Sequence, residues 1–107
     1  MKSKKNDTGK DNLSIDELRD VIGPIAAESN ITAVSLFGSR ATGQYTPSSD
    51  YDFIVDTNDD FTFHDYCKFK DRMMEILDSD IDIIYRSTLR DDIFGRKVRR
   101  EEIHVWS

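Results

Sequence analysis

Apolar residues occur along the chain either at helical spacing or in short continuous runs, and segments of the two kinds alternate. Helical spacing predicts one helix that begins after Ser14 and a longer one over residues 62–78. Short runs rich in β-branched and aromatic residues predict strands over 31–37, 50–56 and 80–85. The expected order is therefore helix, strand, connection, strand, helix and strand, with shorter elements at the end of the chain.

The first helix carries signals at both ends. Ser14 is a suitable N-cap, and Glu17 three residues later completes a capping box. Gly23–Pro24 lies inside the stripe and is expected to kink or split the helix, which ends at Ser29–Asn30. The apolar stripe consists of Leu18, Val21, Ile22, Ile25 and Ala26.

The last third of the chain predicts two short elements. Ser87 would cap a helix over residues 88–94, and Gly95 would end it. Residues 102–106 predict a short strand at an edge of the sheet. All these elements belong to one domain over residues 13–107, because a chain of this length accommodates a single domain.

The elements together predict an α/β (α+β) fold, in which helices pack on a small mixed β-sheet. The short connection between the first two strands is compatible with an antiparallel pair. The helix between the second and third strands forms a crossover, which makes those strands parallel. Strand one would then end at the edge where strands two and three begin. The residues brought to this edge are Gly38, Ser39, Asp50, Asp52, Asp80 and Asp82.

This edge has the residue types that bind a nucleoside triphosphate together with a metal ion. Gly38 and Ser39 follow an apolar strand, where small residues let backbone N–H groups approach a phosphate. Asp50 and Asp52 are two residues apart on a strand, so their carboxylates share one face. Carboxylate and phosphate oxygens are the ligands that Mg²⁺ takes in such sites.

For four residues near this edge, a role in binding a ligand has to be weighed against a purely structural or solvated role. Asp82 lies within an apolar strand, so a metal ion or a nearby cation would offset the cost of burying its charge. Asp80, at the start of that strand, is expected to be solvated. Arg40 is either a phosphate ligand or a solvated surface charge. Tyr45 either stacks on a nucleobase or packs on the protein.

Charge narrows the possible functions. The chain has a net charge of −6, although its first twelve residues contain four Lys and only two Asp. We expect this Lys-rich segment, residues 1–12, to be a disordered leader. The remaining acidic body argues against direct nucleic-acid binding, which needs basic surface. An acidic protein that binds a polyanion needs a cation to offset repulsion, which agrees with a metal site.

Composition also excludes several classes of protein. Cys67 is the only cysteine, so the chain forms no internal disulfide and no Cys-based zinc site. No apolar stretch approaches the roughly 20 residues that span a bilayer, and the N-terminus lacks a signal-peptide pattern. We therefore expect a cytoplasmic protein without a membrane span.

The motifs resemble the nucleotidyltransferase superfamily of the DNA polymerase β type, and more narrowly the MntA-like minimal nucleotidyltransferases. Ten residues separate Ser39 from Asp50, and a third Asp follows on a later strand. The matching segments are 38–43, 49–52 and 81–84, with a similar tail over 90–105. The resemblance covers about residues 14–106, and it implies the polymerase β palm-like fold.

The resemblance also implies roles for individual residues in Mg²⁺-dependent nucleotidyl transfer. Asp50 and Asp52 would coordinate two Mg²⁺ ions bridged by ATP, and Asp82 would bind the second ion and accept the proton of the attacking hydroxyl. The nucleotide-binding set would be Gly38, Ser39, Arg40 and Ser49. The catalytic and metal-binding set would be Asp50, Asp52 and Asp82.

Proteins of this kind are often antitoxins of HEPN-type toxins and adenylylate a toxin tyrosine. The resemblance therefore implies that a partner toxin supplies the acceptor, since the chain is too short for a substrate domain. Two alternatives remain open. The chain could be a non-catalytic, nucleotide-sensing module that blocks a partner sterically. It could also be an adenylyltransferase for a small molecule such as an antibiotic.

Overall fold

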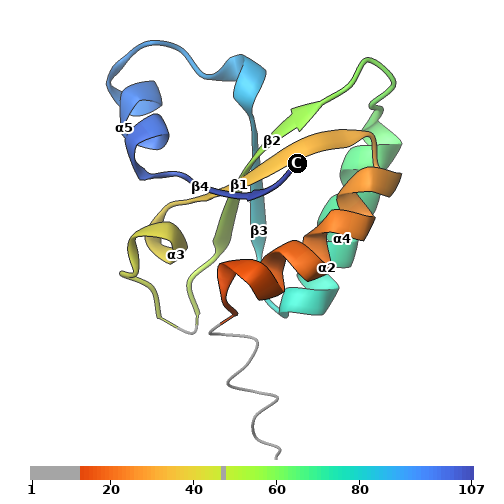
Figure 1. Ribbon diagram of the computed structural model, residues 1–107, viewed down its shortest axis with the longest axis horizontal. Helices are drawn as coiled ribbons and strands as arrows, with labels where there is room; N and C mark the ends of the chain where they lie inside the picture. The colour runs from red at the N-terminus through yellow and green to blue at the C-terminus, as the bar shows by residue number, and fades with distance from the viewer. Residues whose placement is uncertain (1–12, 47) are drawn as a thin grey trace, which may run out of the picture.

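A four-stranded mixed sheet forms the centre of the molecule (Figure 1). The computed structural model describes residues 13–46 and 48–107, and the expected leader lies outside the described residues. The strands are β1 (Ile31–Phe37), β2 (Tyr51–Thr57), β3 (Ile81–Tyr85) and β4 (Ile103–Trp106), in the spatial order β3-β2-β1-β4. β1 pairs antiparallel with β2 and β4, and β2 pairs parallel with β3. The predicted strand directions are confirmed, as is the edge position of the last strand.

The two long helices begin at capping boxes. In α2 (Ile15–Glu28), the hydroxyl of Ser14 accepts a hydrogen bond from the N–H of Glu17, as predicted. Pro24 lies inside α2, yet the helix remains one element rather than splitting. In α4 (Phe63–Leu77), Thr62 and Asp65 form the corresponding pair. Both helices therefore begin where the sequence supplies partners for their first N–H groups.

The two faces of the sheet are covered by different helices. Figure 1 shows α2 and α4 together on one side, with α3 (Ser39–Thr42) and α5 (Ile93–Glu101) on the other. The larger core lies under α2 and α4, where Phe53 and Phe69 are fully buried. On the opposite face, Val98 of α5 packs with Phe37 and Ile54 in a smaller cluster. This second face is less covered, and the predicted site residues border it.

The prediction for the last helix is wrong. Residues Arg86–Thr88 form a single 3₁₀ turn, and α5 runs over Ile93–Glu101 with Gly95 in its first turn. Asp92 is the N-cap, because its carboxylate accepts the N–H of Gly95. Gly95 is required there by close approach, since a Cβ at this position would overlap the carbonyl oxygen of Arg90. Gly95 therefore meets a packing requirement inside α5 and does not end a helix.

An ion-pair network links β2, the 3₁₀ turn and the end of α5. The Arg86 guanidinium donates to Asp56 at 3.2 Å and also pairs with Glu102 through two nitrogens. The Arg86 guanidinium, as hydrogen-bond donor and nearby charge, holds the pKa of Glu102 below its usual range. This network anchors the segment between α5 and β4.

None of the helices within residues 13–46 and 48–107 combines the length and the apolar character needed to cross a bilayer.

Candidate active site

The loop that follows β1 brings a glycine against a carboxylate of β2. Gly38 has φ +81° and ψ −156°, a conformation that is essentially restricted to glycine. A Cβ on Gly38 would also overlap Oδ2 of Asp52. In α3, the first hydrogen bonds run from the N–H groups of Ala41 and Thr42 to the Gly38 carbonyl, so the N–H of Ser39 takes no part in them. The chain therefore turns beside Asp52.

Asp52 and Asp82 face each other across the parallel strands β2 and β3. The two residues are direct register partners, so their side chains lie on the same face of the sheet. Partial burial, together with the neighbouring carboxylate of Asp82 and, to a lesser degree, that of Asp50, raises the pKa of Asp52 to about 6. The pair thus concentrates negative charge without a matching cation from the described residues at this point.

The expectation that Asp82 is a buried carboxylate is wrong. Its side chain is exposed, while Ile81 before it is buried. The physical reason is that β3 is an edge strand, and the side chain of Asp82 faces the less covered side of the sheet. Asp82 is therefore accessible to a ligand, and burial imposes no cost that a metal ion must offset.

The pKa of Asp52 predicts a pH-dependent stability of the metal-free protein. Between the usual value of 3.8 and about 6, the folded state binds more protons at Asp52 than the unfolded state does. Asp52 therefore lowers the free energy of unfolding as pH rises through this range, and the cost persists above it. Asp52→Asn should be more stable than wild type by on the order of 1 kcal/mol at pH 7, after allowance for solvent screening.

Urea unfolding of both proteins in EDTA at pH 4 and pH 7 measures this effect. The stability difference should be close to zero at the lower pH and appear at the higher one. Asp80→Asn, which removes a carboxylate from the same sheet edge, is the matched control. A difference that is equal at both pH values would contradict the assigned cause.

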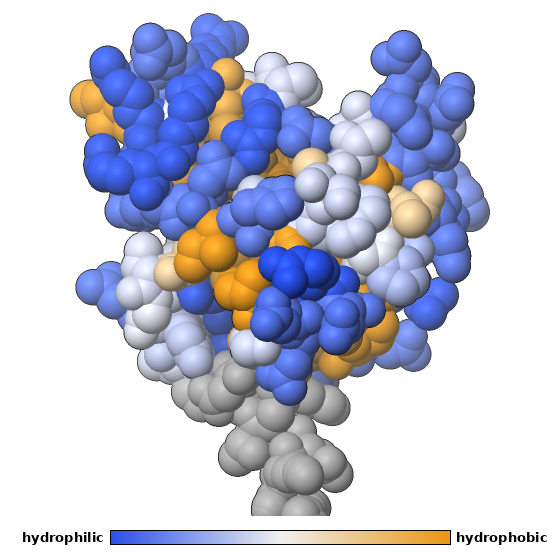
Figure 2. Space-filling model, viewed as in Figure 1, coloured by the Kyte–Doolittle hydropathy of each residue, from blue (hydrophilic) through white to orange (hydrophobic). Residues whose placement is uncertain are grey.

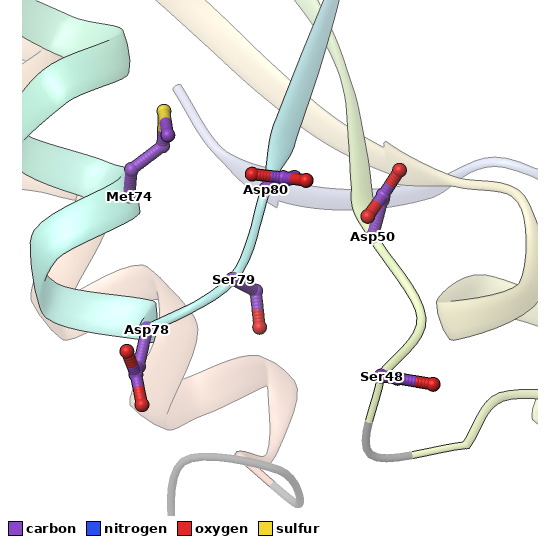
Figure 3. Close-up of a pocket in the computed structure, with 6 residues that line it drawn as sticks. All are labelled: Ser48, Asp50, Met74, Asp78, Ser79 and Asp80. Carbon is purple, nitrogen blue, oxygen red and sulfur yellow. The ribbon is translucent and has the colours of Figure 1, made fainter.

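Asp50 lies just before β2 and lines a pocket of about 360 Å³ at the β2–β3 edge (Figure 3). Figure 3 shows Asp50 and Asp80 at the neighbouring starts of the two strands, with Asp78 at the end of α4. Asp52 and Asp82 do not line this pocket. The described part of the chain contains no group of three carboxylate, His or Cys side chains placed to hold a metal ion. The three predicted metal ligands therefore share one edge without forming a ready-made metal cluster, as expected of like charges that repel.

The donor set nevertheless suits Mg²⁺ bound together with a substrate. This ion is commonly held by one or two carboxylates plus phosphate oxygens. Asp52 and Asp82 supply such a carboxylate pair. The raised pKa of Asp52 reflects its partial burial first and then the neighbouring carboxylates, whose charge a divalent cation would neutralise. Asp50 is exposed at the same edge.

Arg40 is not a solvated surface charge, and it does not line the pocket beside Asp50. It is buried, with 8% of its surface exposed, and its guanidinium lies 4.7 Å from the ring centroid of Tyr45 and 4.2 Å from that of Tyr51. It donates a hydrogen bond of 2.8 Å to the carbonyl of Ser49. Ser49 in turn accepts the N–H of Thr46 with its hydroxyl. In this structure, Arg40, Tyr45 and Ser49 hold the loop that leads to Asp50.

Removal of the Arg40 guanidinium should loosen this loop. Arg40→Met is expected to lower the free energy of unfolding by about 2 kcal/mol, from two cation–π contacts and one charged hydrogen bond. Arg72→Met, an exposed position on α4, is the control and should change stability little. Chemical denaturation compares the two. Equal stability of Arg40→Met and wild type would show that the ring contacts contribute nothing.

A second cavity of about 360 Å³ lies between α3 and α5. Its lining residues are Phe37, Gly38, Ser39, Thr42, Gln44, Phe94, Lys97 and Glu101. Sequence reasoning missed the contribution of α5, because the helix was placed to end at Gly95. The available signal was Asp92 as an N-cap, followed by Phe94 and Val98 four residues apart.

A glycine–serine turn beside paired carboxylates, on a small mixed sheet, is the arrangement expected of a nucleotidyltransferase. Residues 20–107 match the family model described as "Polymerase beta, Nucleotidyltransferase". The chain therefore belongs to the polymerase β nucleotidyltransferase family.

Individual relatives agree with this assignment. The chain is 28% identical, over 90 residues, to a "Putative protein adenylyltransferase" of Methanocaldococcus jannaschii, an alignment that covers 80% of this chain and 97% of that protein. It also matches a solved "putative minimal nucleotidyltransferase" with a TM-score of 0.70, 25% identity and coverage of 86% and 96% of the two chains. A third match is a chain in a structure of "tri-AMPylated Shewanella oneidensis HEPN toxin in complex with MNT antitoxin". Its TM-score is 0.59 at 18% identity, with coverage of 83% and 69%, which supports the fold alone.

Proposed function

We propose that the protein transfers AMP from ATP to a tyrosine hydroxyl of a HEPN-type toxin and thereby acts as its antitoxin. The observation that carries this proposal is the Asp52–Asp82 pair beside the Gly38–Ser39 turn. The name of the archaeal relative and the AMPylated toxin in the neighbouring structure support the choice of AMP and of a protein acceptor.

Each of the site residues would have its own role in the transfer. Asp50, Asp52 and Asp82 would hold Mg²⁺ together with oxygens of the triphosphate, and the bound metal would neutralise charge and orient the α-phosphate. Ser39 and the backbone of its turn would position the triphosphate. The acceptor oxygen would attack the α-phosphorus in line, and the bond to the bridging oxygen would break to release pyrophosphate.

Asp82 is the proposed acceptor of the proton from the attacking hydroxyl. It is the exposed member of the carboxylate pair, so a hydroxyl of a partner protein can reach it. Asp52 lies deeper, between Asp82 and the Gly38 turn, which suits a metal ligand that contacts the nucleotide.

A label-transfer experiment tests the proposal. Purified protein would be incubated with Mg²⁺, lysate of the source organism and ATP labelled at either the α- or the γ-phosphate. Label from the α-position alone on a discrete protein band, with AMP located on tyrosine by mass spectrometry, is the expected result. Absence of any band, with the partner still co-purifying, would refute transfer and favour a module that blocks its partner sterically.

A further inference from the structure

We propose that Lys97, which lines the cavity between α3 and α5, binds the β- and γ-phosphates of the nucleotide and so completes a polyphosphate subsite with the glycine–serine turn. This inference rests on the proposed function, since it concerns the phosphates that leave as pyrophosphate. It adds a residue that the motifs of the chain do not indicate, from a helix that lies about sixty residues beyond the glycine–serine turn in the sequence.

The cavity adjoins the reacting centre directly. Gly38 and Ser39 form one wall, and the Asp52 carboxylate lies so close to Gly38 that a Cβ at this position would overlap it. A triphosphate whose α-phosphate lies near Asp52 therefore extends past Ser39 into this cavity. In Figure 2, the surface over α5, at the upper left, is mostly hydrophilic.

Packing holds α5 in register with the turn. Phe94 meets Phe37 at the end of β1 in an edge-to-face contact, with ring centroids 5.9 Å apart and an interplanar angle of 86°. Val98, four residues later, is fully buried against the sheet. Lys97 follows Phe94 by three residues and so lies on the same side of the helix. The packing of Phe94 and Val98 therefore fixes the position of the Lys97 backbone in the cavity wall that it shares with Ser39.

Charge makes Lys97 the suitable ligand. Among the described residues that line the cavity, Lys97 is the only cation, and it forms no ion pair with other described residues. Arg40, the cation next to Ser39 in sequence, is engaged with Tyr45, Tyr51 and the Ser49 carbonyl instead. A positioned cation stabilises negative charge as it develops on a leaving group. Glu101 also lines the cavity, so the phosphates would lie toward the Ser39 and Lys97 side.

Calorimetric titration with two nucleotides tests the inference without any turnover. The probes are α,β-methylene-ATP, which keeps the β- and γ-phosphates but blocks transfer, and AMP, which lacks them. Lys97→Met should weaken α,β-methylene-ATP binding in excess Mg²⁺ by about ten-fold, the loss expected for one charged phosphate contact. AMP binding should be unchanged.

Two variants separate a local contact from general charge or folding effects. Lys97→Arg should retain most of the affinity. Arg96→Met removes a cation from the same helix outside the cavity and should leave binding unchanged. Wild-type affinity in Lys97→Met, or an equal loss for both probes, would overturn the subsite, as would equal losses in Lys97→Met and Arg96→Met.

The same titration distinguishes this inference from the proposed function. Binding of α,β-methylene-ATP that depends on Lys97, in a protein that transfers no α-label, would support the subsite and refute the transfer to a protein. Transfer of α-label, with nucleotide binding that does not depend on Lys97, would support transfer to a protein and refute the subsite. If wild-type protein bound neither probe, both proposals would fail.

Discussion

Asp52→Asn is expected to reduce nucleotidyl transfer by about three orders of magnitude, because the loss of a metal ligand removes several kcal/mol of transition-state stabilisation. The same substitution should make the metal-free protein more stable near neutral pH, since it removes the carboxylate whose pKa is raised to about 6. The variant would thus be inactive and yet better folded than wild type. Single-turnover transfer of α-label and urea unfolding in EDTA measure the two effects on the same preparation.

Asp80→Asn is the matched control for activity. Asp80 is an exposed carboxylate at the same sheet edge. Its replacement by Asn therefore changes the local charge by the same amount as Asp52→Asn does. It is expected to retain transfer within about three-fold, because surface changes away from reacting groups have small effects. Comparable losses in both variants would mean that the general negative charge of this edge, and not the Asp52–Asp82 pair, is required.

Gly38→Ala is expected to abolish transfer and to destabilise the fold by about 2–3 kcal/mol. One cause is the backbone conformation at φ +81°, ψ −156°, which costs a non-glycine residue 1–3 kcal/mol. The other is the overlap of the new Cβ with Oδ2 of Asp52, which would displace this carboxylate from Asp82. Transfer assays and chemical denaturation report the two consequences separately.

Gly43→Ala isolates the effect of the backbone. Gly43 also has a positive φ, +86°, but a Cβ there meets nothing within 4 Å. This variant should lose about 1–2 kcal/mol of stability and keep its activity at a temperature where it is folded. Retained activity in Gly38→Ala under the same conditions would refute the close approach of this turn to the reacting centre.

Local patterns were sufficient for most of the fold. Short runs rich in β-branched and aromatic residues located the four strands, and helical spacing located the two long helices. The capping box at Ser14 located the start of α2. The crossover rule then determined that β2 and β3 are parallel. These features depend on interactions within a few residues or on chain connectivity, so they can be predicted from the sequence.

Other features depend on contacts between distant residues and were predicted wrongly or left open. The sequence pattern predicts a helix end at Gly95, but this glycine lies in the first turn of α5 because a Cβ there would overlap the Arg90 carbonyl oxygen. Asp82 was expected to be buried, but the edge position of β3 exposes it. The environment of Arg40 was undecided until the rings of Tyr45 and Tyr51 were seen to enclose it.

By itself, the sequence determined the class of chemistry, because the glycine–serine turn and the carboxylates are defined by residue type and by their positions at strand ends. Only the tertiary structure decided how those groups meet. It set Asp52 against Asp82 through the β2–β3 register, and it placed Lys97 of α5 opposite Ser39 through the packing of Phe94 on Phe37. The physical reason is that such contacts join residues far apart in the chain, and their geometry follows from how the helices pack on the sheet.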